Sequence, residues 1–124
     1  MTQITIKEDH RNMTISLTAK GHAGYANIGK DVVCASISML TQTFAQIAFA
    51  LREQGAKVIY RERDGAVHIH IGIDATDEGR ELFEGASCSL QTIEVGYRLL
   101  AKWYPDYIKI TSERASCGEG CSVL

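Results

Sequence analysis

The sequence lacks an excess of charge of either sign. Its 124 residues include 13 lysines and arginines and 15 aspartates and glutamates, for a formal net charge of −2 at pH 7. Proteins that bind nucleic acid or anionic membranes through their overall charge are strongly basic. The balance therefore argues against direct nucleic-acid binding and against attachment to a membrane surface.

A long hydrophobic run and a secretory signal are also missing. The most apolar stretch, residues 32–51, is interrupted by serine, threonine and glutamine, whereas a membrane helix needs about 20 predominantly apolar residues. The first ten residues alternate like a strand and carry early charges, with no apolar signal-peptide region. We therefore expect a cytoplasmic protein whose four cysteines are reduced thiols.

Hydrophobic periodicity predicts an α+β domain with the element order ββαββαβ. Asp64 and Gly65 are typical of a hairpin turn, and Pro105 ends the second helix. We expect one antiparallel-rich sheet with both helices packed on one face. The expected strands are residues 4–7, 13–18, 57–63, 66–73 and 107–112, and the expected helices are residues 31–53 and 77–104.

No internal repeat and no linker divides the chain. One domain of this length has enough residues to form a hydrophobic core, so residues 1–124 are expected to form a single domain. Residues 113–124 show no apolar periodicity. We expect them to form a flexible tail.

The most informative segment is the glycine-punctuated loop before the first expected helix. Gly21, Gly24 and Gly29 give this loop conformational freedom, and His22 lies within it. Cys34 is expected in the first helical turn, where unpaired N–H groups and the positive end of the macrodipole favour thiolate over thiol. An imidazole from the loop would take the thiol proton, as in a Cys–His hydrolase.

A purely structural interpretation of Cys34 stays open, because a lone cysteine on an apolar helix face is usually part of the core. Asp31 either caps the helix, which we favour, or orients the imidazole as a third catalytic residue. Ser38, one turn beyond Cys34, is placed to hydrogen-bond the thiolate, the histidine or a helix carbonyl. The backbone N–H groups of Cys34 and Ala35 would face a developing oxyanion.

Three further groups carry weaker signals. His68 and His70 share one strand face, but two ligands without a matching cysteine or carboxylate set form a poor metal site. Cys117 and Cys121 resemble half of a zinc or redox site and lack a second pair. Cys88 lies in the middle of the second expected helix and is interpreted as structural. We expect no metal site and no cofactor.

The loop and the start of the helix resemble the ribosomal-processing cysteine protease family (Prp) of bacteria. The resemblance implies that Cys34 is the nucleophile and that His22 is the base. The expected layout of helices and strands extends it to about residue 112, whereas the two tail cysteines are not explained by it. The residues that carry it are Gly21-His22-Ala23-Gly24-Tyr25-Ala26, then Gly29-x-Asp31-x-Val33-Cys34-Ala35, then Ser38.

The resemblance also implies a substrate and an oligomeric state. Family members remove the short N-terminal extension of large-subunit ribosomal protein twenty-seven, so that the mature N-terminus can enter the ribosome. They are homodimers, which would suit the apolar residues on the outer side of the first helix. The expected function is therefore a cysteine endopeptidase that acts on this ribosomal protein. The alternatives are a non-catalytic ribosome-assembly factor that binds the same protein and a Cys/His metal or redox protein.

Overall fold

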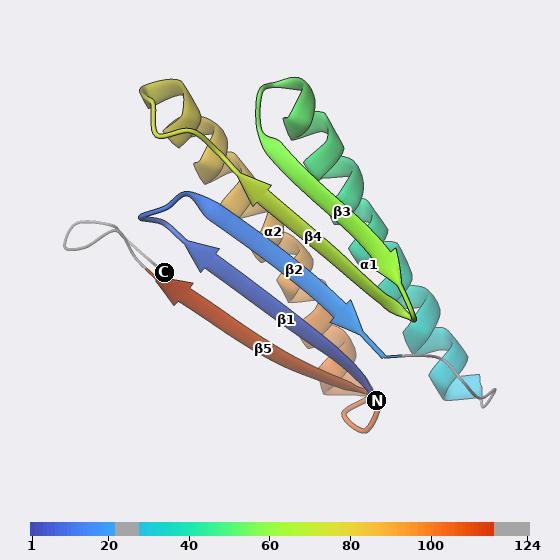
Figure 1. The fold of residues 1–124 in the computed structure, drawn as a ribbon. Coiled ribbons are helices and arrows are strands. Elements are labelled where there is room, and N and C mark those ends of the chain that lie inside the picture. The colour runs from blue at the N-terminus through green and yellow to red at the C-terminus, as the bar shows by residue number, and fades with distance from the viewer. Residues whose placement is uncertain (22–27, 116–124) are drawn as a thin grey trace.

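The computed structural model describes the backbone of residues 1–21 and 28–115, and the side chains of the same residues except 28–31. Within these ranges the elements follow the order ββαββαβ, which confirms the predicted fold class. Both helices lie behind one face of a single sheet, and the other face is open (Figure 1). The strands are β1 (Thr2–Asp9), β2 (Thr14–Lys20), β3 (Lys57–Arg63), β4 (Ala66–Gly72) and β5 (Ile108–Ala115), and the helices are α1 (Ile28–Glu53) and α2 (Asp77–Trp103).

The sheet has the strand order β3-β4-β2-β1-β5. Three of its strand pairs are antiparallel, and only β1 and β5 are parallel, so the sheet is antiparallel-rich as predicted. The β3–β4 hairpin turns at Asp64 and Gly65, whose φ angles are 51° and 75°. Both values lie in the left-handed region that a two-residue hairpin turn requires. The turn signal in the sequence is therefore confirmed.

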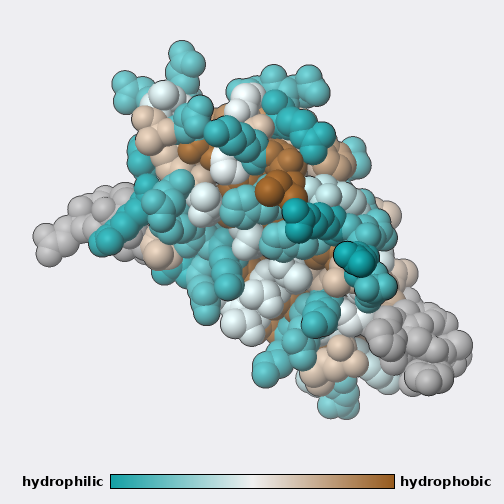
Figure 2. Space-filling model, viewed as in Figure 1, coloured by the Kyte–Doolittle hydropathy of each residue, from teal (hydrophilic) through white to brown (hydrophobic). Residues whose placement is uncertain are grey.

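The hydrophobic core lies between the sheet and the two helices. Alternate residues of the central strands face the helices, as the period-two pattern predicts. These residues are at most 1% exposed: Ile4, Ile6, Ile15, Leu17, Ile69 and Ile71. The helices contribute Phe44, Phe83, Leu90 and Tyr97, which are 0% exposed. The opposite residues of each strand, His68 and His70 among them, form the open face, which is mainly hydrophilic (Figure 2).

Helix α1 is the most apolar element of the domain. Its segment Val32–Glu53 has a mean hydropathy of 1.5, and its length and composition alone would allow it to cross a membrane. The polar residues in this stretch therefore do not exclude a membrane helix, contrary to our expectation. In the structure Val33, Phe44 and Ala48 of this segment are at most 1% exposed within the core. Core packing against the sheet and α2 thus accounts for part of its hydrophobicity.

Helix α1 begins at Ile28, three residues before the expected start at Asp31. Aspartate is a common N-cap residue, and this preference placed the predicted helix start too far along the chain. Asp31 is therefore inside the helix and is not its N-cap. Cys34 is the seventh residue of the helix and lies in its second turn, not in the first.

Strand β5 continues to Ala115, three residues beyond the predicted end at Ser112. The expected start of the tail at Glu113 is therefore wrong. Apolar periodicity ends early because the last two positions of β5 that face the helices are Ser112 and Arg114. The rest of the predicted tail, with Cys117 and Cys121, lies outside the described residues.

A charge network ties the end of β5 to β1 and α2. The side chain of Glu8 is fully buried and accepts hydrogen bonds from Arg114 and Ser87. Arg114 also donates to Glu94 at 2.7 Å. Burial alone would raise the pKa of Glu94, but hydrogen bonds from Arg114 and Arg98 outweigh it and hold this pKa below its usual value. The network therefore stabilises a carboxylate pair around one shared arginine.

We expect Arg114→Ala to lower the free energy of unfolding by about 3 kcal/mol, because it removes the guanidinium that is paired with the buried Glu8 carboxylate. Urea denaturation measures the loss. The matched control is Arg63→Ala, because the Arg63–Asp64 pair has side chains that are 89% and 92% exposed and such surface pairs contribute little. Equal losses in the two variants would contradict the importance of the network.

Candidate active site

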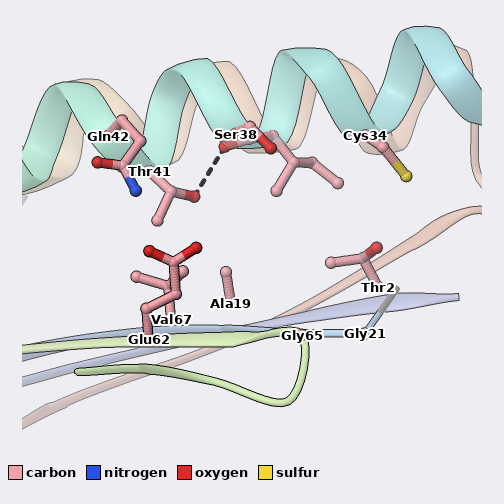
Figure 3. Close-up of a pocket in the computed structure, with 11 residues that line it drawn as sticks. Thr2, Ala19, Gly21, Cys34, Ser38, Thr41, Gln42, Glu62, Gly65 and Val67 are labelled. Carbon is pink, nitrogen blue, oxygen red and sulfur yellow. Dashed lines mark hydrogen bonds between the residues drawn. The ribbon is translucent and has the colours of Figure 1, made fainter. Parts of the chain in front are cut away.

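A cavity of about 150 Å³ lies between the first half of α1 and the sheet. Helix α1 forms one wall, and the ends of β1 and β2 and the β3–β4 hairpin form the other (Figure 3). This volume is below the roughly 300–1,000 Å³ of most small-molecule sites and suits one side chain or a short part of an extended peptide. Its lining residues are Thr2, Ala19, Gly21, Cys34, Ile37, Ser38, Thr41, Gln42, Glu62, Gly65 and Val67.

One stripe of α1 forms the helical wall of this cavity. Cys34, Ser38 and Thr41 follow one another at four- and three-residue steps, which place them on the same side of a helix. The thiol of Cys34 is free and partly buried. Thr41 donates to the carbonyl of Ile37 at 2.7 Å, and the Tyr97 hydroxyl lies 2.6 Å from the Thr41 oxygen. The Thr41–Tyr97 contact thereby connects the cavity wall to α2.

Gly21 forms the edge of the cavity at the end of β2. Its φ of 133° is one that other residues rarely adopt, and a Cβ here would lie 2.8 Å from the Met1 carbonyl oxygen and the Thr2 Cα. Only glycine therefore fits this close approach to the N-terminus. Gly21 and Cys34 line the same cavity, and Gly21 is the residue that directly precedes His22 in the chain.

The structure brings three of the sequence-predicted site residues together: Gly21, Cys34 and Ser38 line one cavity. His22 and Gly24 lie outside the described residues. Gly29 and Asp31 are part of α1, and their side-chain positions are not described. Ala35 is exposed and lines a groove between α1 and α2 instead.

The expected oxyanion site at the helix start is wrong. The N–H groups of Cys34 and Ala35 belong to the seventh and eighth residues of α1, so they are not among the unpaired donors of the first turn. The effect of the macrodipole also falls off within the first turn. Cys34 therefore receives less help from the helix start than the sequence suggested.

Sequence reasoning missed two polar residues of the cavity, Gln42 and Glu62. They are joined through Tyr60, whose hydroxyl accepts a hydrogen bond from Gln42 Nε2 at 2.8 Å and donates to Glu62 Oε2 at 3.0 Å. Only the alternation of β3, which places Glu62 on the same face as Tyr60, could have indicated its position. An exposed glutamate near a hairpin otherwise has no distinguishing pattern.

The histidine pair lies on the open face of the sheet, opposite the helices. The rings of His68 and His70 stack at 6.4 Å, and His68 Nδ1 lies 2.8 Å from the Thr18 hydroxyl. Burial lowers the pKa of His68, and the nearby positive charges of His70 and Arg61 lower it further. Among residues 1–21 and 32–115, whose side chains are described, no cluster of three or more histidine, cysteine or acidic side chains could hold a metal ion.

Cys88 is exposed on α2. Its side chain is therefore not part of the hydrophobic core. The core-facing residues around it are its neighbours Ala86, Ser87 and Leu90. Of the two cysteines in the described residues, only Cys34 lines the cavity.

An α+β domain with a free thiol in a cavity between helix and sheet has the parts of a small cysteine-dependent hydrolase. The model of the family described as cysteine protease Prp matches residues 1–109. The chain therefore belongs to this family of ribosomal-processing cysteine proteases, and it is a cysteine protease. This match confirms the resemblance seen in the sequence.

Two curated relatives cover most of the chain. The ribosomal processing cysteine protease Prp of Bacillus subtilis is 28% identical over 102 residues, which are 79% of this chain and 91% of the relative. The protease of the same name from Staphylococcus aureus is 26% identical over 97 residues, or 78% of this chain and 92% of the relative. The matched region includes most of both relatives.

Solved structures share the fold. The essential ribosomal processing protease Prp from S. aureus, in complex with a substrate peptide, has a TM-score of 0.65 and 20% identity, covering 90% of this chain and 99% of that one. SMU.848 from Streptococcus mutans has a TM-score of 0.62 and 22% identity, covering 92% and 95%. At these identities the similarity establishes the fold.

Proposed function

We propose that this cysteine protease removes the N-terminal extension of large-subunit ribosomal protein twenty-seven by a Cys–His mechanism. The observation that carries the proposal is that Cys34 and Gly21 line one cavity, because His22 follows Gly21 directly in the chain. The choice of substrate rests on the family resemblance of this segment. The S. aureus relative, solved with a substrate peptide, supports peptide binding in this fold.

The proposed reaction proceeds through a thioester. His22 takes the proton of the Cys34 thiol, and the sulfur attacks the scissile carbonyl carbon to form a C–S bond. The C–N bond then breaks, and His22 returns the proton to the leaving amine. Water, deprotonated by His22, attacks the thioester carbonyl, the C–S bond breaks, and His22 returns the proton to the Cys34 sulfur. The carboxylic acid product loses its proton to solvent and leaves as the carboxylate. One water molecule is consumed for each peptide bond cleaved.

Two residues are proposed to support this chemistry. Asp31 is not the N-cap, because α1 begins at Ile28. We therefore propose that the Asp31 carboxylate orients the His22 imidazole. Ser38 lines the cavity one turn after Cys34. We propose that its hydroxyl hydrogen-bonds the thiolate or the imidazole.

We further propose that the protein is a homodimer that pairs through the outer face of α1 and α2. An apolar groove of about 460 Å³ runs between these helices, and large apolar side chains around it are exposed, including Met39 at 70% and Trp103 at 62%. Exposed apolar patches of this kind mark interaction sites. Sedimentation equilibrium should show a dimer that Trp103→Glu converts to a monomer; a monomeric wild-type protein would refute the proposal.

We also propose that the protein acts in the cytoplasm and binds neither nucleic acid nor a membrane. The net charge is −2, and the core-facing side of α1, with Val33, Phe44 and Ala48, is buried in the domain. Ribosomal proteins are assembled in the cytoplasm, where a protease for their extensions must act. Localisation of a tagged copy by cell fractionation tests this, and recovery in the membrane fraction would contradict it.

The proposed function is tested by mixing the purified protein with the extended ribosomal protein and measuring intact masses. We expect two products whose masses sum to that of the substrate plus one water. These masses also identify the scissile bond. An unchanged substrate that co-purifies with the protein would instead support the non-catalytic assembly factor.

A further inference from the structure

Among the residues whose side chains the structure describes, Glu62 is the only charged one that lines the cavity with Cys34. Its carboxylate is directed from the β3–β4 hairpin towards α1 and lies across from Thr41 and Gln42 (Figure 3). The other lining residues are apolar or carry neutral hydroxyl, thiol or amide groups. The described part of the cavity wall thus presents one negative charge, that of Glu62, to whatever occupies this end.

The position of the Glu62 carboxylate is fixed by hydrogen bonds that do not neutralise it. Tyr60 donates to Glu62 Oε2 at 3.0 Å, and Gln42 of α1 holds the Tyr60 hydroxyl at 2.8 Å. The Tyr60 ring packs against Phe49 of α1 at 5.6 Å between centroids. Among the described residues, the ion pairs involve other carboxylates and leave Glu62 without a cationic partner.

We infer that Glu62 determines specificity by binding a lysine or arginine side chain of the peptide substrate. This inference rests on the proposed protease function of the same cavity. A cationic side chain would supply the missing counter-charge and form a charge-assisted hydrogen bond with the carboxylate. A neutral or acidic side chain would leave the Glu62 charge without that partner.

The spacing along α1 predicts where this basic residue lies in the substrate. Glu62 faces Thr41, seven residues after Cys34, and at about 1.5 Å per residue these positions are roughly 10 Å apart. An extended peptide advances about 3.3 Å per residue. The basic residue is therefore expected three or four residues from the scissile bond.

The test uses peptides that span the scissile bond and carry one lysine, moved through the four positions on each side. At one position, the third or the fourth, lysine should raise kcat/KM about tenfold over glutamine, as for one charge-assisted hydrogen bond. The gain should appear mainly in KM, because the contact is remote from the reacting carbonyl. Equal cleavage of all the peptides would overturn the inference.

The variant Glu62→Gln keeps a group that can accept from Tyr60 and removes the charge. It should reduce the lysine-to-glutamine preference from about tenfold to about one, and Glu62→Lys should reverse the preference in favour of a glutamate peptide. The control is Glu113→Gln, an exposed carboxylate on β5 at the other edge of the sheet, which should keep the lysine preference. A lysine preference that persists in Glu62→Gln would refute the role of Glu62. Failure of the wild-type protein to cleave any peptide or the extended ribosomal protein would instead refute the proposed function.

Discussion

Replacement of Cys34 by alanine should abolish cleavage of the extended ribosomal protein and leave the domain folded. Loss of the nucleophile costs about a million-fold in kcat in a well-studied serine protease, so we expect a loss of at least about 10⁴-fold here. The fold should tolerate the change because Cys34 is only partly buried and already lines a cavity. Product masses over time measure the turnover, and urea denaturation measures the stability.

The matched control for this variant is Cys88→Ala. Cys88 is a free cysteine on the other helix, and it is exposed, so its loss should leave turnover at the wild-type level. Turnover near the wild-type rate in Cys34→Ala would show that the nucleophile is another residue. An inactive but folded Cys34→Ala protein should still bind the substrate, which a pull-down with the extended ribosomal protein measures.

Replacement of His22 by alanine should reduce kcat by about 10²–10⁴-fold, the usual contribution of a general base or acid. The start of α1 at Ile28 makes this prediction stronger. Because Cys34 lies in the second turn and the macrodipole acts mainly within the first, we expect ionisation of the thiol to depend more strongly on a side chain that takes its proton. Steady-state kinetics at neutral pH with the cleavable peptide measures the loss.

The control for His22→Ala is His70→Ala. His70 lies on the open face of the sheet, opposite the helices, and pairs in register with Ser16 and Ile59. Its loss should leave kcat unchanged. A loss of only a few-fold in His22→Ala would show that His22 is structural and that another group accepts the proton.

The fold could be predicted from the sequence wherever the pattern is local. Alternating residues such as Ile69 and Ile71, and the turn at Asp64 and Gly65, determine strands and a hairpin without reference to the rest of the chain. The end of β5 could not be predicted in this way. It depends on Arg114, whose buried partner Glu8 is 106 positions away in the sequence, and a charged residue at a core-facing position breaks the apolar alternation.

The site residues on α1 could be predicted from the sequence, whereas those on the opposite wall of the cavity could not. Cys34 and Ser38 share a helix face by their spacing, which the sequence alone reveals. The oxyanion site at Cys34 and Ala35 depended on a helix boundary, and an error of three residues removed it. Glu62 was missed because its position is fixed by Tyr60 and Gln42, which come from two different elements.

The most direct test of Cys34 as the nucleophile is covalent labelling with a peptide chloromethyl ketone that ends at the scissile bond identified from the product masses. Such a reagent alkylates the thiol that attacks the peptide carbonyl. Peptide mapping by mass spectrometry should find one adduct per chain, on Cys34, formed more slowly in His22→Ala and blocked by excess substrate. Labelling of Cys88, Cys117 or Cys121 ahead of Cys34, or cleavage that continues after Cys34 is fully labelled, would contradict the proposed mechanism.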